Sequence, residues 1–249
     1  MTEKQRPVII EGAMKEEVEY LMNALQDRKD LLIGGCPAAE GTIQGVPAVV
    51  IRSFVGTVNG AVATALAIEK YQPALVISQG TAGSHMPEIG PEAIVIADRI
   101  CALNCFMTGQ RPAGAGMKPE DWQDFPIDVK AGEWKKLSSL PCHPCAAHAA
   151  AAVSDRYNGI FIGTIGSGDV WDKEADRIRL LHSRFGSLCE EMEGWGVGQT
   201  CSRYGVPFCV IRVISYNELT GSPFRPQTAE LCQRFVEDIL DIMYKEVTE

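Results

Sequence analysis

The feature of this 249-residue sequence that most constrains its fold is a series of short apolar segments that alternate with segments of helical periodicity. The apolar segments are residues 8–10, 46–53, 74–78, 93–97, 159–165 and 208–214. The segments with helical spacing of apolar residues are 15–26, 60–71, 173–185, 193–204 and 226–246. Strands without polar alternation are buried on both faces, so the pattern predicts an α/β fold in which helices cover both sides of a central sheet.

We expect a single domain over residues 1–249, because neither an internal repeat nor a low-complexity linker interrupts the alternation. An irregular segment at about residues 103–128 departs from it, since this stretch is rich in Gly and Pro. A segment of that length is either a lid or binding loop, or a surface excursion. Phe106, Met107 and Trp122 would give it something to pack with, and both alternatives stay open.

Composition excludes several classes of partner. The 32 acidic and 23 basic residues give a net charge of −9, and the basic residues are scattered, which argues against a nucleic-acid partner but allows a locally positive pocket. No apolar run approaches the roughly 18 residues that span a bilayer, and the N-terminus lacks the signal-peptide pattern, so we expect no membrane partner and a cytoplasmic location. Nine cysteines, an odd number, favour reduced and mostly buried thiols. We expect no cofactor.

Function should be sought where the strands end, because ligands of α/β sheets bind outside the carboxyl ends of the strands. The four junctions of interest are residues 11–14, 79–83, 166–169 and 215–217. Three of them are glycine-rich, which allows backbone amides to approach a ligand closely. The second junction has neither the GxxxxGK[ST] nor the GxGxxG pattern, so no ATP loop or dinucleotide site is predicted.

Two acidic clusters are candidates for chemistry. Glu16, Glu17 and Glu19 begin a predicted helix, where they either favour the helix dipole or supply a general base. The stretch LCEEMEGWGVG, residues 188–198, carries three carboxylates in its first half. These lie either in a solvated loop or in a site where carboxylates accept hydrogen bonds from two vicinal sugar hydroxyls.

The stretch PCHPCAAHAAAA raises the question of a metal or redox site, because it contains Cys142, His143, Cys145 and His148. A structural zinc site needs four ligands, and no second CxxC or HxxxH follows at suitable spacing. We therefore predict thiols packed at the start of an alanine-rich helix and no metal site.

Five motifs in one order resemble the nucleoside phosphorylase and nucleosidase superfamily, especially the methylthioadenosine/S-adenosylhomocysteine nucleosidases. They are GAMKEEV after the first strand, a TAG turn at Thr81-Ala82-Gly83, SGD at 167–169, EMEG at 191–194 and VPFCVIRVIS at 206–215. No one motif is specific, but the five in this order are. The resemblance implies a three-layer α/β/α fold with a mixed central sheet. It also implies a homodimer in which the partner chain closes part of the pocket.

The same resemblance assigns the hydrolytic machinery. Glu17 matches the carboxylate that positions and deprotonates the attacking water, and Arg212 and Thr81 would help to hold that water. Ala82 and Gly83 continue the substrate-binding turn. Such a general base typically contributes about 10²- to 10⁴-fold to the rate.

The substrate contacts also follow from the resemblance. Met192 and Glu193 would flank the ribose, with Glu193 accepting hydrogen bonds from its 2' and 3' hydroxyls. Trp171 would lie against the purine face. Because cleavage of an N-glycosidic bond builds an oxocarbenium-like sugar, carboxylates near the ribose would stabilise the developing positive charge.

Hydrolysis and phosphorolysis differ in the nucleophile that attacks the sugar carbon, which is water in hydrolysis and phosphate in phosphorolysis. Phosphorylases of the superfamily bind phosphate with arginines, one of them just before the (S/T)xG turn, and here that position is Gln79. Glutamine cannot replace a cationic, bidentate phosphate ligand, so we predict water as the nucleophile. Arg52 keeps phosphorolysis as the alternative.

The sequence departs from the nucleosidase pattern at the leaving base. The aspartate that protonates N7 of adenine in those enzymes is replaced by Tyr216. Three alternatives follow: Asn217 pairs with a 6-oxopurine, Glu218 acts as a substitute acid, or the chain binds a nucleoside without turnover. We expect the first, because an amide is both donor and acceptor.

Overall fold

The computed structural model describes residues 5–125 and 138–249 of the chain. The strands are β1 Val8–Gly12, β2 Gln26–Ile33, β3 Cys36–Ile43, β4 Val46–Arg52, β5 Leu75–Ser84, β6 Ile94–Ala102, β7 Phe106–Met107, β8 Gln123–Asp124, β9 Ser139–Pro141, β10 Ile160–Ser167, β11 Ser187–Glu191 and β12 Phe208–Tyr216. The α-helices are α1 Glu19–Ala24, α2 Thr57–Tyr71, α3 Cys145–Ala150, α4 Ala175–Phe185, α5 Gly194–Tyr204 and α6 Thr228–Thr248. Short 3-10 turns are η1 Lys15–Glu17, η2 Pro119–Asp121 and η3 Ser154–Arg156.

Ten strands form one mixed sheet in the order β11-β10-β6-β12-β5-β1-β4-β3-β2, with β9 paired to β6. The central strands β4, β1, β5 and β12 are parallel, whereas β6 runs antiparallel to β12. Strand β11 pairs with β10 and also, antiparallel, with the end of β5. The sheet therefore curls until β11 meets β5, and one part of it closes into a small barrel.

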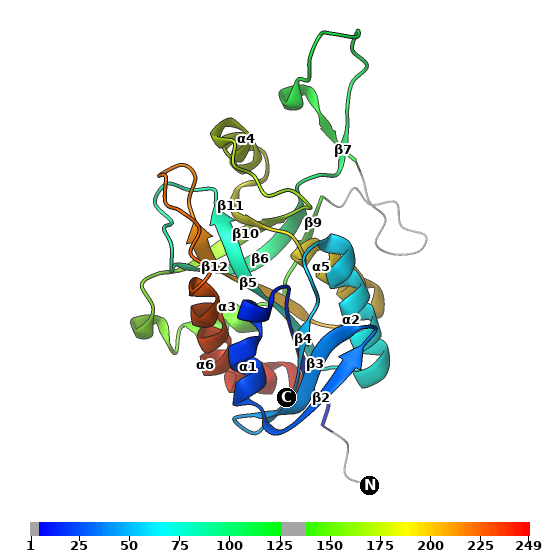
Figure 1. Ribbon diagram of the computed structural model, residues 1–249, viewed down its shortest axis with the longest axis vertical. Helices are drawn as coiled ribbons and strands as arrows, with labels where there is room; N and C mark the ends of the chain where they lie inside the picture. The colour runs from blue at the N-terminus through cyan, green and yellow to red at the C-terminus, as the bar shows by residue number, and fades with distance from the viewer. Residues whose placement is uncertain (1–4, 126–137) are drawn as a thin grey trace.

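Two hydrophobic clusters lie on opposite faces of this sheet, as the alternation of side chains along a strand requires. In β12, Cys209, Ile211 and Val213 pack with α1, α3 and α6, whereas Val210 and Ile214 pack with α2 and α5. Figure 1 shows α2 beside α5 on one side of the sheet and α1 with α6 on the other. The predicted three-layer α/β/α arrangement with a mixed sheet is confirmed.

The structure adds six strands that apolar periodicity did not indicate. Three of them, β7, β8 and β9, have only two or three residues, and the other three are β2, β3 and β11. β2 is polar and mostly exposed, because it is the edge strand of the antiparallel extension β4-β3-β2. β3 carries a Pro and a Gly within its eight residues. β11 contains two adjacent glutamates, for which a solvated loop was one of the two predictions, but both of those glutamates are buried.

Two predicted strands run further than expected, and this changes the local structure of the site. Thr81, Ala82 and Gly83 were predicted in a turn, but they lie inside β5, which continues to Ser84 because β12 and β11 pair with its end. β12 continues to Tyr216, and its register against β5 shifts between Ile214 and Tyr216. This irregularity is a bulge, and it changes which face of the strand the following side chains occupy.

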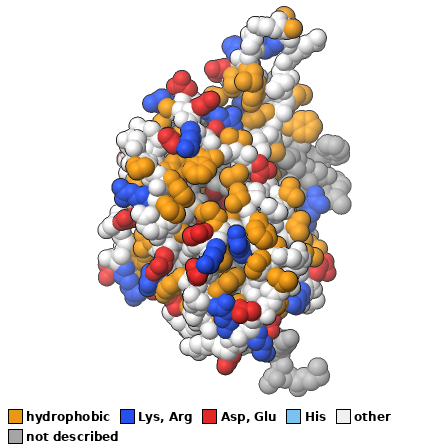
Figure 2. Space-filling view, viewed as in Figure 1, with side chains coloured by type: hydrophobic (Ala, Val, Ile, Leu, Met, Phe, Trp, Pro, Cys, Tyr) orange, Lys and Arg blue, Asp and Glu red, His pale blue; other side chains and the backbone are white. Residues whose placement is uncertain are grey.

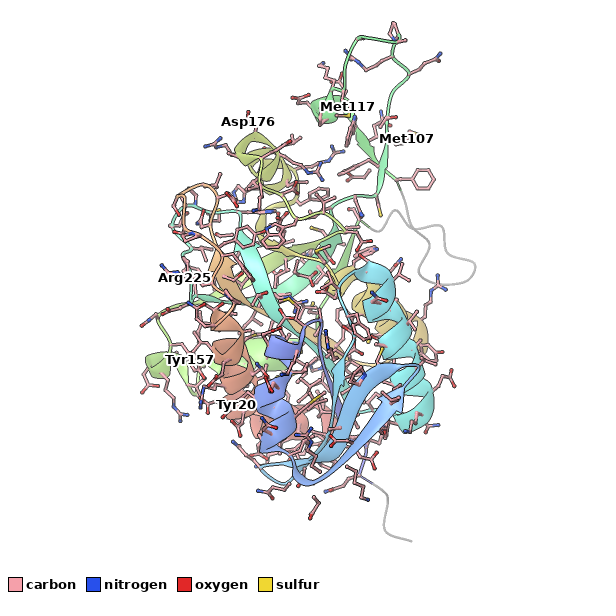
Figure 3. The ribbon with its side chains drawn as sticks, in the orientation of Figure 1. Tyr20, Met107, Met117, Tyr157, Asp176 and Arg225 are labelled. Atoms are coloured by element: carbon pink, nitrogen blue, oxygen red, sulfur yellow. The ribbon has the colours of Figure 1, made fainter. Side chains whose placement is uncertain are left out.

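The irregular segment predicted at residues 103–128 is described to residue 125, and residues 126–128 lie outside the described part. Its strands β7 and β8 pair with each other and project from the body of the molecule (Figure 1). The base of this hairpin is held by Arg184, whose guanidinium lies 4.7 Å from the centre of the Phe106 ring and bonds Asp124. Figure 3 shows Met107 and Met117 on the projecting part, and Met117 is 82% exposed.

The nine cysteines are all free, as the sequence analysis expected. Within PCHPCAAHAAAA, Cys145 Sγ lies 3.4 Å from Cys209 Sγ, whereas His148 lies at the surface beside Glu246. In the described parts of the chain, no helix is both long enough and apolar enough to cross a membrane. That ten of the twelve described strands share one sheet supports our proposal that the chain is one domain.

Candidate active site

A pocket opens at the carboxyl ends of β1, β5, β11 and β12. Eight residues that the sequence analysis proposed for the site line it: Glu17, Thr81, Ala82, Gly83, Trp171, Met192, Glu193 and Tyr216. Arg212 and Asn217 are not among the lining residues.

The Glu17 carboxylate is held at the pocket wall by four hydrogen bonds. Its Oε2 accepts from the backbone N–H of Ala13 at 2.9 Å and of Met14 at 3.0 Å. Its Oε1 accepts from the Thr81 N–H at 2.7 Å and from the Thr81 hydroxyl at 2.9 Å. Since both oxygens are fixed and Glu17 is 4% exposed, the carboxylate has one orientation in the pocket.

Gly80 is required for this arrangement. A Cβ atom built on Gly80 would lie 2.7 Å from Glu17 Oε1, and the residue has a φ of +155°, which side chains rarely adopt. Gln79, which precedes it, donates its side-chain amide to the backbone carbonyl of Glu17. The glycine-rich end of β5 therefore positions Glu17 instead of cradling a phosphate.

Arg212 lies behind the pocket, where it is 1% exposed. Its Nη2 forms an ion pair with Glu191 Oε2 and donates to the Ser78 hydroxyl at 3.0 Å, and its Nη1 donates to the Ile211 carbonyl at 2.9 Å. The same Nη2 lies 3.6 Å from Glu193 Oε2. Arg212 thus holds two pocket carboxylates in place, a positioning role that differs from the direct contact with water predicted for it.

Glu193 lines the pocket with a carboxylate that is only partly satisfied by the protein. Its Oε1 accepts from the Gly56 N–H at 2.9 Å. Burial and the neighbouring charge of Glu191 raise the pKa of Glu193 to about 8, although Arg212 opposes this shift. Hydroxyl groups of a bound sugar would supply donors that favour its carboxylate form.

The other carboxylates of the family-like motifs hold helix N-termini next to the pocket. Asp169, of the SGD motif, accepts from the N–H and hydroxyl of Thr57 at the start of α2. Glu191 accepts from the N–H of Gly194 at the start of α5, and Ser167 accepts from the N–H of Trp195. These bonds satisfy N–H groups that a helix leaves free, so the motifs fix the pocket walls.

Three aromatic rings form one end of the pocket, which we call the aromatic end: Trp171, Tyr216 and Phe224. The ring centres lie 5.5 Å apart for Trp171 and Tyr216 and 5.3 Å apart for Trp171 and Phe224. Tyr216 crosses Gly83 so closely that a Cβ there would lie 2.2 Å from its hydroxyl. A planar base can stack at such a surface.

Asn217 is fully buried outside the pocket, and its amide is already used by the chain itself. Its Nδ2 donates to the carbonyls of Met86 and Ile89 at 2.9 and 3.1 Å, and its Oδ1 accepts from the Leu219 N–H at 3.0 Å. The predicted pairing of Asn217 with a 6-oxopurine is therefore corrected, because the amide has no free donor to offer a base. Glu218, the other alternative, is likewise not among the lining residues.

Some lining residues were not assigned from the sequence. Val55, Val170 and Phe224 are single apolar residues in connections, where no periodicity marks them. Glu190 belongs to the acidic cluster that was considered for sugar hydroxyls, but it lies against Tyr216 at the aromatic end. The signal that could have found it is the run of two glutamates at the end of an apolar strand.

The charge of the pocket bears on the choice of nucleophile. Of the described residues that line it, Glu17, Glu190, Glu191 and Glu193 are acidic and none is Lys or Arg. Arg52 packs its guanidinium 5.0 Å from the centre of the Phe54 ring and is not a lining residue. Over the face shown in Figure 2, basic and acidic side chains are interspersed. Among residues 5–125 and 138–249, no group of three or more His, Cys, Asp or Glu could hold a metal ion.

Residues 7–243 match the model of the family described as the phosphorylase superfamily. The chain is 33% identical over 205 residues to the 5'-methylthioadenosine/S-adenosylhomocysteine nucleosidase of Geobacillus thermodenitrificans, covering 82% of this chain and 81% of that protein. It is 33% identical over 209 residues to the protein of the same name from Halalkalibacterium halodurans, covering 82% of each.

Solved structures show the same fold. The nucleosidase of Neisseria meningitidis in complex with methylthio-immucillin-A matches with a TM-score of 0.78 at 24% identity, covering 94% of this chain and 98% of that chain. A mutant futalosine hydrolase of Helicobacter pylori matches with a TM-score of 0.77 at 22% identity, covering 95% and 99%.

Proposed function

We propose that this chain, which belongs to the phosphorylase superfamily, hydrolyses the N-glycosidic bond of a purine nucleoside. The observation that carries the proposal is the fixed Glu17 carboxylate, which shares one pocket with Glu193 and with three aromatic rings. The names of relatives that are 33% identical support it, because they are nucleosidases. The pocket offers a base, acceptors for sugar hydroxyls and a stacking surface, which are the parts that this reaction needs.

The geometry suggests how the parts act. Glu17, with Thr81 beside it, takes a proton from a water molecule that attacks the sugar carbon. Glu193 accepts hydrogen bonds from the ribose hydroxyls, next to Met192. The negative charge of these carboxylates stabilises the oxocarbenium-like sugar as the bond to the base breaks.

We propose water and not phosphate as the nucleophile. The lining carboxylates would repel a phosphate dianion, and no described Lys or Arg side chain lines the pocket to bind one. Gln79 bonds the Glu17 backbone. Phosphorolysis is therefore the second candidate, and the dependence of base release on phosphate tests it.

The base is the finer part of the proposal. A 6-oxopurine was predicted from Asn217, whose amide is engaged by the backbone. The relatives are named for methylthioadenosine and S-adenosylhomocysteine, both adenine nucleosides with a sulfur-linked 5' group. We propose a substrate of that class for this chain.

Release of free base from a panel of nucleosides tests the function. Methylthioadenosine, S-adenosylhomocysteine, inosine, guanosine and uridine are each incubated with the protein, with and without phosphate. We expect adenine from the first two at a rate that phosphate does not change. Release that depends on phosphate would show a phosphorylase, release from inosine alone would restore the 6-oxopurine preference, and binding without release would show a nucleoside-binding protein.

We also propose a homodimer. Val58, Val62 and Leu66 form an exposed apolar stripe along α2, at 71%, 47% and 39% exposure, and Val55 extends it to the pocket. An exposed apolar stripe of this kind at the mouth of a site is typical of an interface. In analytical ultracentrifugation we expect about twice the 27.1 kDa chain mass, and a Val62→Glu variant should shift to the monomer. A wild-type monomer would contradict the dimer.

A cytoplasmic location remains a proposal supported by the free thiols, and cell fractionation tests it.

A further inference from the structure

Beneath the aromatic end of the pocket lies a buried polar cluster that the proposed mechanism does not use. Glu190 Oε1 accepts from the Tyr216 hydroxyl at 3.1 Å and from the Asp172 N–H at 3.0 Å. Glu190 Oε2 lies 3.3 Å from His85 Nε2, and His85 Nδ1 lies 2.8 Å from the Ser187 hydroxyl. Glu190 lines the pocket itself, so the cluster reaches the place where the base would bind.

Two carboxyl groups meet in this cluster. Asp172 and Glu190 are each 4% exposed, and the Asp172 side chain is within hydrogen-bonding contact of Glu190. Burial, and next the charge of Glu190, raise the pKa of Asp172 to about 7, against the pull of its ion pair with Arg177 at 2.6 Å. Two adjacent buried carboxyl groups cannot both ionise at low cost, and the charge of Glu190 therefore contributes to the raised pKa of Asp172.

We propose that Glu190, oriented by the hydroxyl of Tyr216, protonates the departing base, and that Asp172 keeps the required proton on the Asp172–Glu190 pair. This rests on the proposed nucleosidase function and names the group that completes it. The Tyr216 hydroxyl, at the end of β12, contacts a carboxyl group from β11, and both strands pair with the end of β5.

The step balances. The bond between the sugar carbon and the base nitrogen breaks, and its electron pair goes to the base. The base takes the proton of the carboxyl pair through Glu190, while the attacking water bonds to the sugar carbon and gives its proton to Glu17. The carboxyl pair regains a proton from solvent and Glu17 releases one, so the net change is the addition of water to the nucleoside.

Arg177 and the Asp172 side chain are not lining residues, whereas Glu190 and Tyr216 are. Asp172 acts through Glu190 and is a positioning residue. The groups that face the pair and set its charge are Arg177, His85 and Tyr216.

The test compares Glu190→Gln with wild type on ribosides of one 5' group and increasingly good leaving groups: adenine, 6-chloropurine and 4-nitrophenol. The glutamine oxygen can still accept hydrogen bonds from the Tyr216 hydroxyl and from the Asp172 N–H, so we expect the variant to fold. We expect kcat to fall about 10²- to 10⁴-fold for adenine and no more than about tenfold for 4-nitrophenol, which needs no proton. The control Glu17→Gln should lose similar factors on the whole series.

An equal loss of kcat in Glu190→Gln across the series would overturn the proposal. If that variant does not fold, Tyr216→Phe is assayed on the same series, with a smaller loss but the same trend expected, and a flat response again counts against the proposal. In Asp172→Asn, the fall of kcat at alkaline pH should move to lower pH, because the like charge that holds the proton is gone; an unmoved profile would remove Asp172 from the mechanism. If wild type releases no base from any nucleoside, the proposed function itself fails.

Discussion

Glu17→Gln is expected to lower kcat for the best nucleoside of the panel by about 10²- to 10⁴-fold, while the dissociation constant of that nucleoside changes by less than about tenfold. An amide cannot take the proton of the attacking water at neutral pH. It would still fill the same space against Thr81. Single-turnover kinetics give the chemical step, and calorimetric titration of the variant, which turns over too slowly to interfere, gives the affinity.

Glu17→Gln should also be less stable than the wild type, and this loss of stability must be separated from the loss of catalysis. All four groups around Glu17 are donors in its bonds, so an NH₂ group in place of one oxygen loses acceptors for two of them. Each lost bond to a buried donor costs about 1–3 kcal/mol, so the melting temperature should fall, and assays belong well below it.

The matched control is Glu16→Gln. Glu16 is adjacent in sequence but exposed, and it makes no side-chain hydrogen bond within the described residues. Its kcat should stay within about twofold of wild type. If Glu17→Gln kept full activity, or if nucleoside binding were lost together with turnover, Glu17 would not be the general base.

Much of the site could be predicted because its residues lie in or near five short motifs whose order along the chain resembles that of a known superfamily. Glu17, Thr81, Met192, Glu193 and Trp171 all line the pocket. Their spacing in sequence reflects the parallel strands that bring their ends to one edge. This part of the site could be predicted from local sequence, because each of these residues lies within a few positions of a strand end.

What could not be predicted depends on contacts between segments far apart in the sequence. The amide of Asn217 is taken by carbonyls of residues 86 and 89, about 130 positions earlier, and no local pattern encodes that pairing. The bulge between Ile214 and Tyr216 likewise arises where β12 meets β5. Glu190 became a candidate acid only when the closure of the sheet brought β11 against the end of β5.

The role of Arg212 also depends on contacts that the sequence does not reveal. The family resemblance predicted that it helps to hold the attacking water, whereas the structure buries it behind the pocket. A fully buried guanidinium is stable only if its partners remain charged and close. Here those partners are Glu191 and Glu193, and Glu191 also binds the N-terminus of α5 through Gly194. Removal of the cation would therefore leave the Glu191 carboxylate uncompensated in the interior.

We expect Arg212→Met to lower the free energy of unfolding by about 3–5 kcal/mol, the usual cost of breaking a buried ion pair from one side. In the double variant Arg212→Met/Glu191→Gln, the uncompensated charge of Glu191 is also gone, while the glutamine oxygen can still accept from Gly194. The double variant should therefore be more stable than the sum of the two single variants predicts, by about 0.5–3 kcal/mol.

Urea denaturation of the four proteins measures this coupling. The control is Arg179→Met, which removes an exposed ion pair with Asp176 and should change stability by no more than about 0.5 kcal/mol. Strict additivity of Arg212→Met and Glu191→Gln would mean that the two side chains do not stabilise each other. Positive coupling would instead mean that the Arg212 cation stabilises the Glu191 carboxylate, the group that also holds the N-terminus of α5 at the pocket wall.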